Sequence, residues 1–236
     1  MGNLSALSLF LAFAGGIFPA LLWLWFWLKE DGARPEPRGL ILATFLAGMI
    51  AVIASLFIEQ RINAFGFGSL VTIFLWAATE EITKFGGAWI AALRRRENDE
   101  PVDSMMYLIT AALGFAALEN VLFIIGPLSG GNVIETLITG NLRFIGSTLL
   151  HIVSSAVIGI MLAFTFCELP HIKRFATIVG LFTAISLHTL FNFFILRSDN
   201  NLFVVFSFVW IGVIILFLFF ELIKHRNRTC LTKTNI

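Results

Sequence analysis

Charged residues are scarce in this chain. Asp, Glu, Lys and Arg make up 13% of its 236 residues, whereas apolar residues make up 58%. A soluble domain carries about 25% charged residues, so this shortage excludes an ordinary soluble domain and makes lipid the solvent for most of the chain. The net charge of +1 gives no basis for a nucleic-acid partner.

Cysteine and a cationic leader are also lacking. The two cysteines, Cys167 and Cys230, form no C-x-x-C pair, so a zinc ribbon is excluded. No positive segment precedes the first apolar run, and that run is longer than the roughly 7–15 residues of a signal-peptide core. We therefore expect a retained membrane helix at the start of a single membrane domain that covers residues 1–236.

Long apolar runs are what the chain has instead. Seven segments reach the length of about 20 apolar residues that a transmembrane helix needs. They are Leu4–Leu28, Gly39–Ile58, Leu70–Leu93, Met105–Ile125, Arg143–Phe166, Phe175–Leu196 and Leu202–Ile223. Lipid cannot pair the free backbone N–H and C=O groups of an open sheet, which excludes such a sheet. The runs are also too long for the strands of a membrane barrel. The sequence predicts an all-α polytopic bundle of about seven spans. The fourth helix is expected to end in a loop at Gly126–Gly131, which is followed by a short interfacial helix over Asn132–Leu142.

Lys and Arg orient this predicted bundle. Alternate connectors, together with the C-terminal tail, hold twelve of these residues, and the remaining connectors hold three. Cytoplasmic loops carry the excess of positive residues. The N-terminus is therefore predicted outside and residues 224–236 form a cytoplasmic tail, as expected for a multi-pass protein of the plasma membrane.

The third apolar run contains charges that lipid disfavours. A charged side chain at the bilayer centre costs about 2.5–3.5 kcal/mol on insertion scales, so such groups face the protein interior and are usually functional. Glu80 and Lys84 are four residues apart, and we expect them to share a helix face and pair. Glu81 is the direct neighbour of Glu80. Two adjacent carboxylates in a low dielectric hold their protons differently, which suits acid–base chemistry.

Further polar groups lie in the next three runs. The fourth run holds Glu119 and Asn120, the fifth holds His151, and the sixth holds His188 and Asn192 four residues apart. The fifth run also carries a stripe of polar and small residues at four-residue spacing. Its members are Arg143, Ser147, His151, Ser155 and Gly159.

Helix geometry places the strongest of these groups at one level. Counting 1.5 Å per residue from the outer end of each run, Glu80 lies about 15 Å deep, Glu119 about 9 Å, and both His151 and His188 about 12 Å. Four helices thus deliver carboxylates and imidazoles to one layer in the outer half of the membrane. We interpret this layer as a catalytic site within a core of residues 70–196.

Simpler interpretations cover single residues. One intramembrane histidine or a stripe of small residues is explained by helix packing, and Glu59 and Glu221, at span ends, are expected to be interfacial. The alternative function is a proton-coupled transporter or a non-catalytic scaffold. Transporters often show internal repeats and interrupted spans, whereas this chain shows no repeat and no proline in its third to sixth runs.

The pattern resembles the PrsW family of intramembrane proteases. The matching pieces are Glu80-Glu81-x-x-Lys84, Pro101-Val102-Asp103, the stretch from Gly114 through Phe115 to Glu119-Asn120, His151, and His188-x-x-x-Asn192. That family is similar to the CAAX prenyl endopeptidases, whose Phe-x-x-x-His motif is replaced here by Phe115-x-x-x-Glu119. The resemblance implies peptide-bond hydrolysis in a single-pass membrane protein near its outer side, such as the first cut of an anti-sigma factor.

Two mechanisms fit these residues. In the first, Glu119, His151 and His188 bind Zn²⁺, and Glu80 or Glu81 acts as general base. In the second no metal is present: Glu80 or Glu81 activates water with help from Glu119 or His151, and His188 and Asn192 donate to the oxyanion. The first mechanism is favoured because it uses every residue of the layer.

Overall fold

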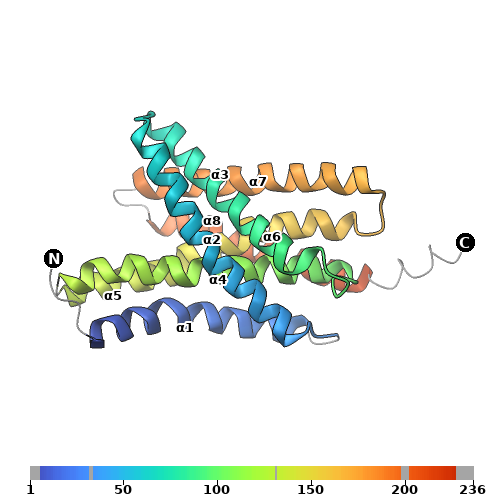
Figure 1. Cartoon of the computed structure of the whole chain (residues 1–236), viewed down its shortest axis with the longest axis horizontal. Helices are drawn as coiled ribbons and strands as arrows, with labels where there is room; N and C mark the ends of the chain where they lie inside the picture. The colour runs from blue at the N-terminus through green and yellow to red at the C-terminus, as the bar shows by residue number, and fades with distance from the viewer. Residues whose placement is uncertain (1–5, 32–33, 131, 198–201, 227–236) are drawn as a thin grey trace, which may run out of the picture.

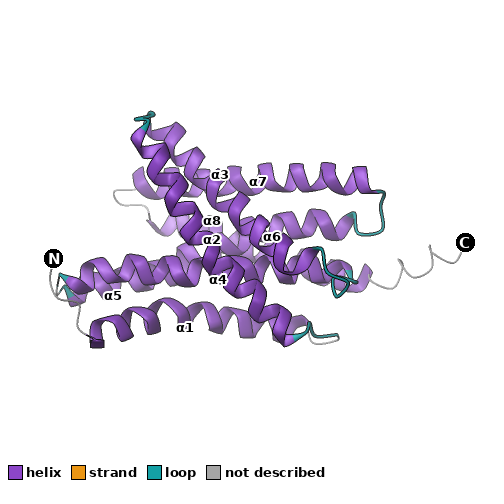
Figure 2. Cartoon of the chain, viewed as in Figure 1, coloured by secondary structure: helices purple, strands orange, loops and turns teal. Residues whose placement is uncertain are grey.

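The computed structural model describes all residues except 1–5, 32–33, 131, 198–201 and 227–236. The described part consists of helices joined by loops and turns, with no strand (Figures 1 and 2). The elements are α1 (Ala6–Asp31), α2 (Arg38–Ala64), α3 (Ser69–Ala88), η1 (Trp89–Leu93), α4 (Pro101–Ser129), α5 (Val133–Leu142), η2 (Arg143–Ser147), α6 (Thr148–Phe164), α7 (Pro170–Arg197) and α8 (Leu202–Arg226). The predicted all-α membrane class is confirmed.

Six helical segments of the described chain are long and apolar enough to cross a membrane. The third predicted span is not among them, because α3 holds Glu80, Glu81 and Lys84 within five residues. It does run directly into the π-helical segment η1. The count of seven spans and the orientation of the bundle therefore stay predictions.

Two predicted boundaries differ from the structure. α4 does not end at Gly126 but continues through Pro127 to Ser129, because a proline near the end of a helix removes only one backbone hydrogen bond. The segment expected to be a separate interfacial helix is α5, and it continues through the π-helical η2 into α6. These elements give one apolar helix over Ile134–Phe164.

α4 forms the centre of the bundle. Residues 101–117 are buried, and α4 contacts α1, α2 and α6 (Figure 1). Small residues allow the close approach of α2 and α4: a Cβ atom added at Gly48 would overlap the carbonyl of Ala111, and one added at Gly114 would overlap the carbonyl of Phe45. This reciprocal contact fixes α2 against the helix that carries Glu119.

We expect Gly114→Ala to lower the free energy of unfolding by about 1–3 kcal/mol, because overpacking forces the α2 and α4 backbones apart. Gly86→Ala is the matched control, since an added Cβ at that helical position meets no atom within 4 Å. It is expected to be neutral or slightly stabilising. Thermal unfolding in one detergent checks both variants, and equal melting temperatures for the two would contradict the role of the α2–α4 contact.

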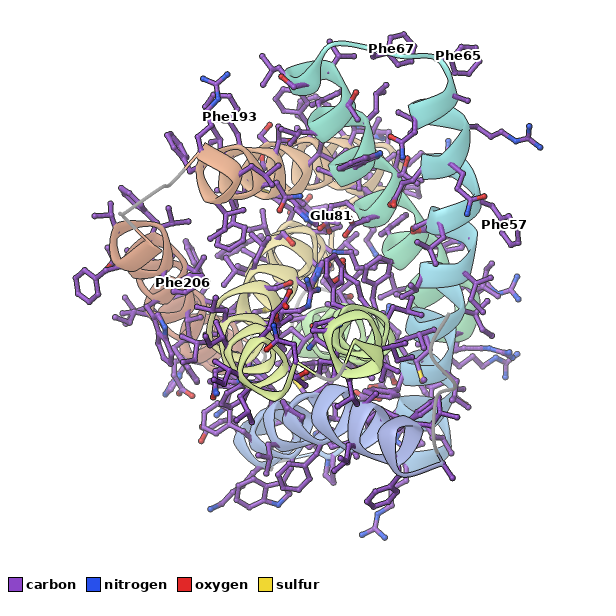
Figure 3. The ribbon with its side chains drawn as sticks, turned by 90° about the vertical axis from the view of Figure 1, so that its left-hand side faces the viewer. Phe57, Phe65, Phe67, Glu81, Phe193 and Phe206 are labelled. Atoms are coloured by element: carbon purple, nitrogen blue, oxygen red, sulfur yellow. The ribbon has the colours of Figure 1, made fainter. Side chains whose placement is uncertain are left out.

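The α2–α3 hairpin leans away from the other helices. It runs obliquely across α4 and α6, and its turn lies beyond α7 in Figure 1. The turn contains Gly66 at a φ of 65°, a conformation that favours glycine. Phe65 and Phe67 beside it are exposed, and Figure 3 shows both at the edge of the molecule. The tilt leaves room between this hairpin, α4 and α7.

Candidate active site

A cavity of about 550 Å³ lies between the α2–α3 hairpin, the second half of α4, η2, α6 and α7. Its polar lining contains four of the predicted site residues besides Asn192. These four are Glu80, Glu119, His151 and His188. The structure therefore brings together the groups that the depth argument placed in one layer, and it gives them a shared opening.

Glu81 is the most enclosed group of the site. Its side chain is fully buried, and Figure 3 shows it in the middle of the bundle. Oε1 accepts hydrogen bonds from Lys84 Nζ at 2.6 Å, Ser154 Oγ at 2.8 Å and His188 Nδ1 at 2.7 Å, while Oε2 accepts one from Ser155 Oγ at 3.0 Å. Both oxygens are thus occupied by donors, so this carboxylate holds its neighbours in place.

The expected pair between Glu80 and Lys84 is wrong. Lys84 forms its ion pair with Glu81 instead, three residues away, and both side chains are buried. Its Nζ also lies 3.0 Å from His151 Nδ1 and 5.1 Å from the centroid of the Phe115 ring. The rotation of α3 turns Glu81 inward toward α6 and α7, so the lysine follows this carboxylate.

His188 has a defined proton arrangement. A carboxylate can only accept, so the 2.7 Å contact with Glu81 places the proton of the imidazole on Nδ1. The lone pair of Nε2 then faces Glu80 Oε2, which is 3.6 Å away. A carboxylate behind a histidine in this way fixes the ring and makes the opposite nitrogen a better ligand or base.

His151 shows the same arrangement with a different carboxylate. Its Nε2 lies 2.9 Å from Glu119 Oε2, so Nε2 carries the proton and Nδ1 keeps its lone pair. Nδ1 lies 3.9 Å from Glu80 Oε2 and accepts from Lys84. The two imidazoles meet edge to face with their centroids 5.2 Å apart. Each histidine is therefore oriented by its own glutamate.

Glu80 is the carboxylate that faces both lone pairs. Its Oε2 is buried and has no hydrogen-bond partner among the described residues. Glu80, His151 and His188 each offer one ligand atom, and these three atoms lie within 4.8 Å of one another. The group that could hold a metal ion thus contains Glu80, where the sequence placed Glu119.

Glu119 is held on the other side of His151. Arg143 Nη2 pairs with Glu119 Oε2, and Arg143 Nε donates to Asn120 Oδ1 at 2.6 Å. Asn120 in turn donates to Thr148 Oγ1 at 3.0 Å. This network ties α4 to η2 and α6, and it leaves Glu119 as the partner of a cation and of an imidazole.

Sequence reasoning missed some of these contributors. Arg143 had been named as a member of the polar stripe but given no role in the site, and Ser154 had been given no role, although it donates to Glu81. Ser155, explained before by close packing, also donates to Glu81. The available signal was the four-residue spacing of Arg143, Ser147 and His151 along one helix face. Asn192 lines the cavity one turn after His188.

The fold and the site define a multi-pass membrane protein with a histidine–glutamate centre buried among its helices. A family model described as PrsW family intramembrane metalloprotease matches residues 36–222. The chain therefore belongs to this family. The resemblance seen in the sequence and the prediction of an intramembrane protease are confirmed at the level of the family.

Curated relatives agree with this assignment. The chain is 30% identical to Protease PrsW of Geobacillus kaustophilus over 154 residues, which cover 64% of this chain and 65% of that protein. It is 25% identical to Protease PrsW of Halalkalibacterium halodurans over 217 residues, covering 87% and 95%. For Protease PrsW of Bacillus subtilis the values are 31% over 121 residues, covering 50% and 56%. No solved structure was found to match the chain.

Proposed function

We propose that this protein hydrolyses a peptide bond of a membrane-anchored protein at the centre formed by Glu80, His151 and His188. The observation that carries the proposal is the convergence of Glu80 Oε2, His151 Nδ1 and His188 Nε2 at one side of the cavity. Buried titratable groups that meet in a cleft are typical of active sites, and here each histidine is also held by a carboxylate behind it.

The residues of this centre fit a metal ion. Two histidines and one carboxylate are a known donor set for catalytic zinc, and Glu80 Oε2 is a buried oxygen without a partner among the described residues. Bound there, zinc would act as a Lewis acid on water and on the substrate carbonyl. Lys84 donates to His151 Nδ1 and would have to release that nitrogen.

The side chains of the protein divide the work as follows. Glu81 and Glu119 keep the distal protons of His188 and His151 in place, so that the other ring nitrogens face Glu80. Without a metal ion, Glu80 accepts the proton of the attacking water directly. Asn192 lines the same cavity and supplies an amide donor for the developing oxyanion.

The substrate we propose is a single-pass membrane protein cut near its outer side. The surplus of Lys and Arg in alternate connectors favours an outer location for the α2–α3 turn, and the cavity extends toward that end of the hairpin. We propose the first cut of an anti-sigma factor as the biological reaction, as the resemblance seen in the sequence implies.

Removal of metal tests this proposal. We expect purified full-length protein to lose cleavage of a single-pass substrate when a strong chelator strips its metal, and to regain it when zinc is restored. Activity that survives complete removal of metal would reject the zinc centre in favour of Glu80 as sole base. No cleavage of any candidate substrate above the level of His188→Ala, with zinc present, would overturn the protease proposal.

A further inference from the structure

Glu59 on α2 is a charged group of the cavity that the proposed chemistry does not use. Its side chain lines the cavity with Glu80 and Glu119, and it forms no ion pair or hydrogen bond with the described residues. The sequence placed Glu59 at a span end, in contact with the membrane interface. In the structure this side chain is partly buried at the wall of the cavity.

Glu59 belongs to a polar line along α2. Ser55, Glu59 and Asn63 are spaced by four residues, so they share one helix face, and all three line the cavity. Ser55 marks the deep end, where its Oγ lies 2.7 Å from Thr83 Oγ1 of α3. Phe57 is two residues before Glu59, about 200° around the helix, and Figure 3 shows it pointing away from the bundle.

The neighbouring helix α3 supplies a hydrogen-bond donor to the same cavity. Trp76 on α3 lines the cavity, and its Nε1 is buried without a hydrogen-bond partner among the described residues. Asn63 adds an amide that both donates and accepts. An extended peptide in lipid needs hydrogen-bond partners for its backbone N–H and C=O groups. These side chains can supply such partners to an extended segment of a bound substrate.

The negative charge of Glu59 indicates which kind of substrate side chain this part of the cavity would bind. Arg143 pairs with Glu119, while Glu59 forms no ion pair with any cation in the described part of the chain. A carboxylate inside a membrane helix is unfavourable unless it serves a partner, and it can only accept hydrogen bonds. The complementary group is a cation on a long flexible stem, and lysine and arginine are the residues that extend in this way near the ends of membrane spans.

We propose that Glu59, with Asn63 and Trp76, forms a subsite for a lysine or arginine of the substrate. This residue lies on the flank of the cut that points toward the α2–α3 turn. The inference rests on the proposed function, since it assigns part of the substrate to the same cavity.

The test compares single-pass model substrates that differ in one flanking residue. A single lysine, a single glutamate or a neutral residue is scanned through the positions around the cut, and kcat/KM is measured with full-length protein in detergent. With the unmodified protein we expect lysine at one position to raise kcat/KM about tenfold or more over the neutral substrate, the order expected for a desolvated charge pair.

Variants assign this preference to Glu59. Glu59→Gln should remove the lysine preference, and Glu59→Arg should reverse it in favour of glutamate. The matched control is Glu59→Gln combined with Gln60→Glu, which keeps the charge of α2 but moves it to an exposed position outside the cavity. It should lack the preference as well. The same lysine preference in unmodified protein and Glu59→Gln would overturn the subsite.

A binding measurement separates this inference from the proposed function. A photo-crosslinking residue at Leu56, which lines the cavity, reports substrate contact without cleavage. Crosslinking that favours the lysine substrate only when Glu59 is present supports the subsite, even if no substrate is cut and hydrolysis is rejected. Cleavage without any charge preference, together with equal crosslinking of all substrates, leaves hydrolysis standing and overturns the subsite.

Discussion

Replacing His188 with alanine is expected to lower the rate of peptide-bond cleavage by at least about 1,000-fold. The substitution removes Nε2, one of the three ligand atoms that converge on the centre, and it removes one of the hydrogen-bond donors to the buried Glu81 carboxylate. General acid–base groups alone contribute about 10²–10⁴-fold. Cleavage of a single-pass membrane substrate by purified protein gives the measurement.

The same helix provides a control for this substitution. His171 lies in the first turn of α7, exposed and remote from the cavity, so His171→Ala should cleave as the unmodified protein does. The cleavage rate of Glu81→Gln should fall as that of His188→Ala does, because a neutral amide no longer orients the imidazole as a carboxylate does. Unchanged cleavage in both His188→Ala and Glu81→Gln would reject the protease proposal and favour a scaffold or a transporter.

Replacing Lys84 with methionine is expected to lower the free energy of unfolding by about 3–5 kcal/mol. Its Nζ is the cation beside a carboxylate that is fully buried, and removal of one partner of a buried ion pair leaves the other charge uncompensated. Unfolding followed by heat or denaturant in one detergent measures the loss.

Two further variants show whether burial causes this loss. Lys224 also pairs with a glutamate three residues earlier, Glu221, but both side chains are partly exposed. Lys224→Met should therefore cost less than about 1 kcal/mol. Lys84→Met combined with Glu81→Gln removes the uncompensated charge, and we expect it to recover much of the stability but no activity. A Lys84→Met protein as stable as Lys224→Met would contradict this account.

The histidines show how far a sequence can locate a site. Spacing and depth placed His151 and His188 in one layer, because a rise of 1.5 Å per residue is fixed and membrane spans run roughly parallel. They could not say which carboxylate each ring would meet. Glu119 meets His151, and Glu81 meets His188. These contacts depend on the rotation of four helices about their axes, which the number of residues in a span does not determine.

Within one helix, too, residue spacing did not determine the contacts, as three residues of α3 show: Glu80, Glu81 and Lys84. Spacings of three and four residues both bring side chains together, so the sequence allowed Lys84 to pair with either glutamate. Contacts between helices determine which glutamate pairs with Lys84. Ser154 and Ser155 of α6 and His188 of α7 surround Glu81, so this carboxylate lies in the interior, where Lys84 reaches it. Glu80 is left facing the cavity with a free oxygen.

The sequence alone determined the membrane class, the helices and the presence of a buried polar layer. Lipid satisfies no backbone group and penalises each charge, so these features follow from composition and position along the chain. Only the tertiary structure decided which lone pairs converge, that Arg143 holds Glu119, and that Glu59 faces a cavity. Such features depend on helix rotation and on the tilt of the α2–α3 hairpin, which are set by packing between segments far apart in the chain.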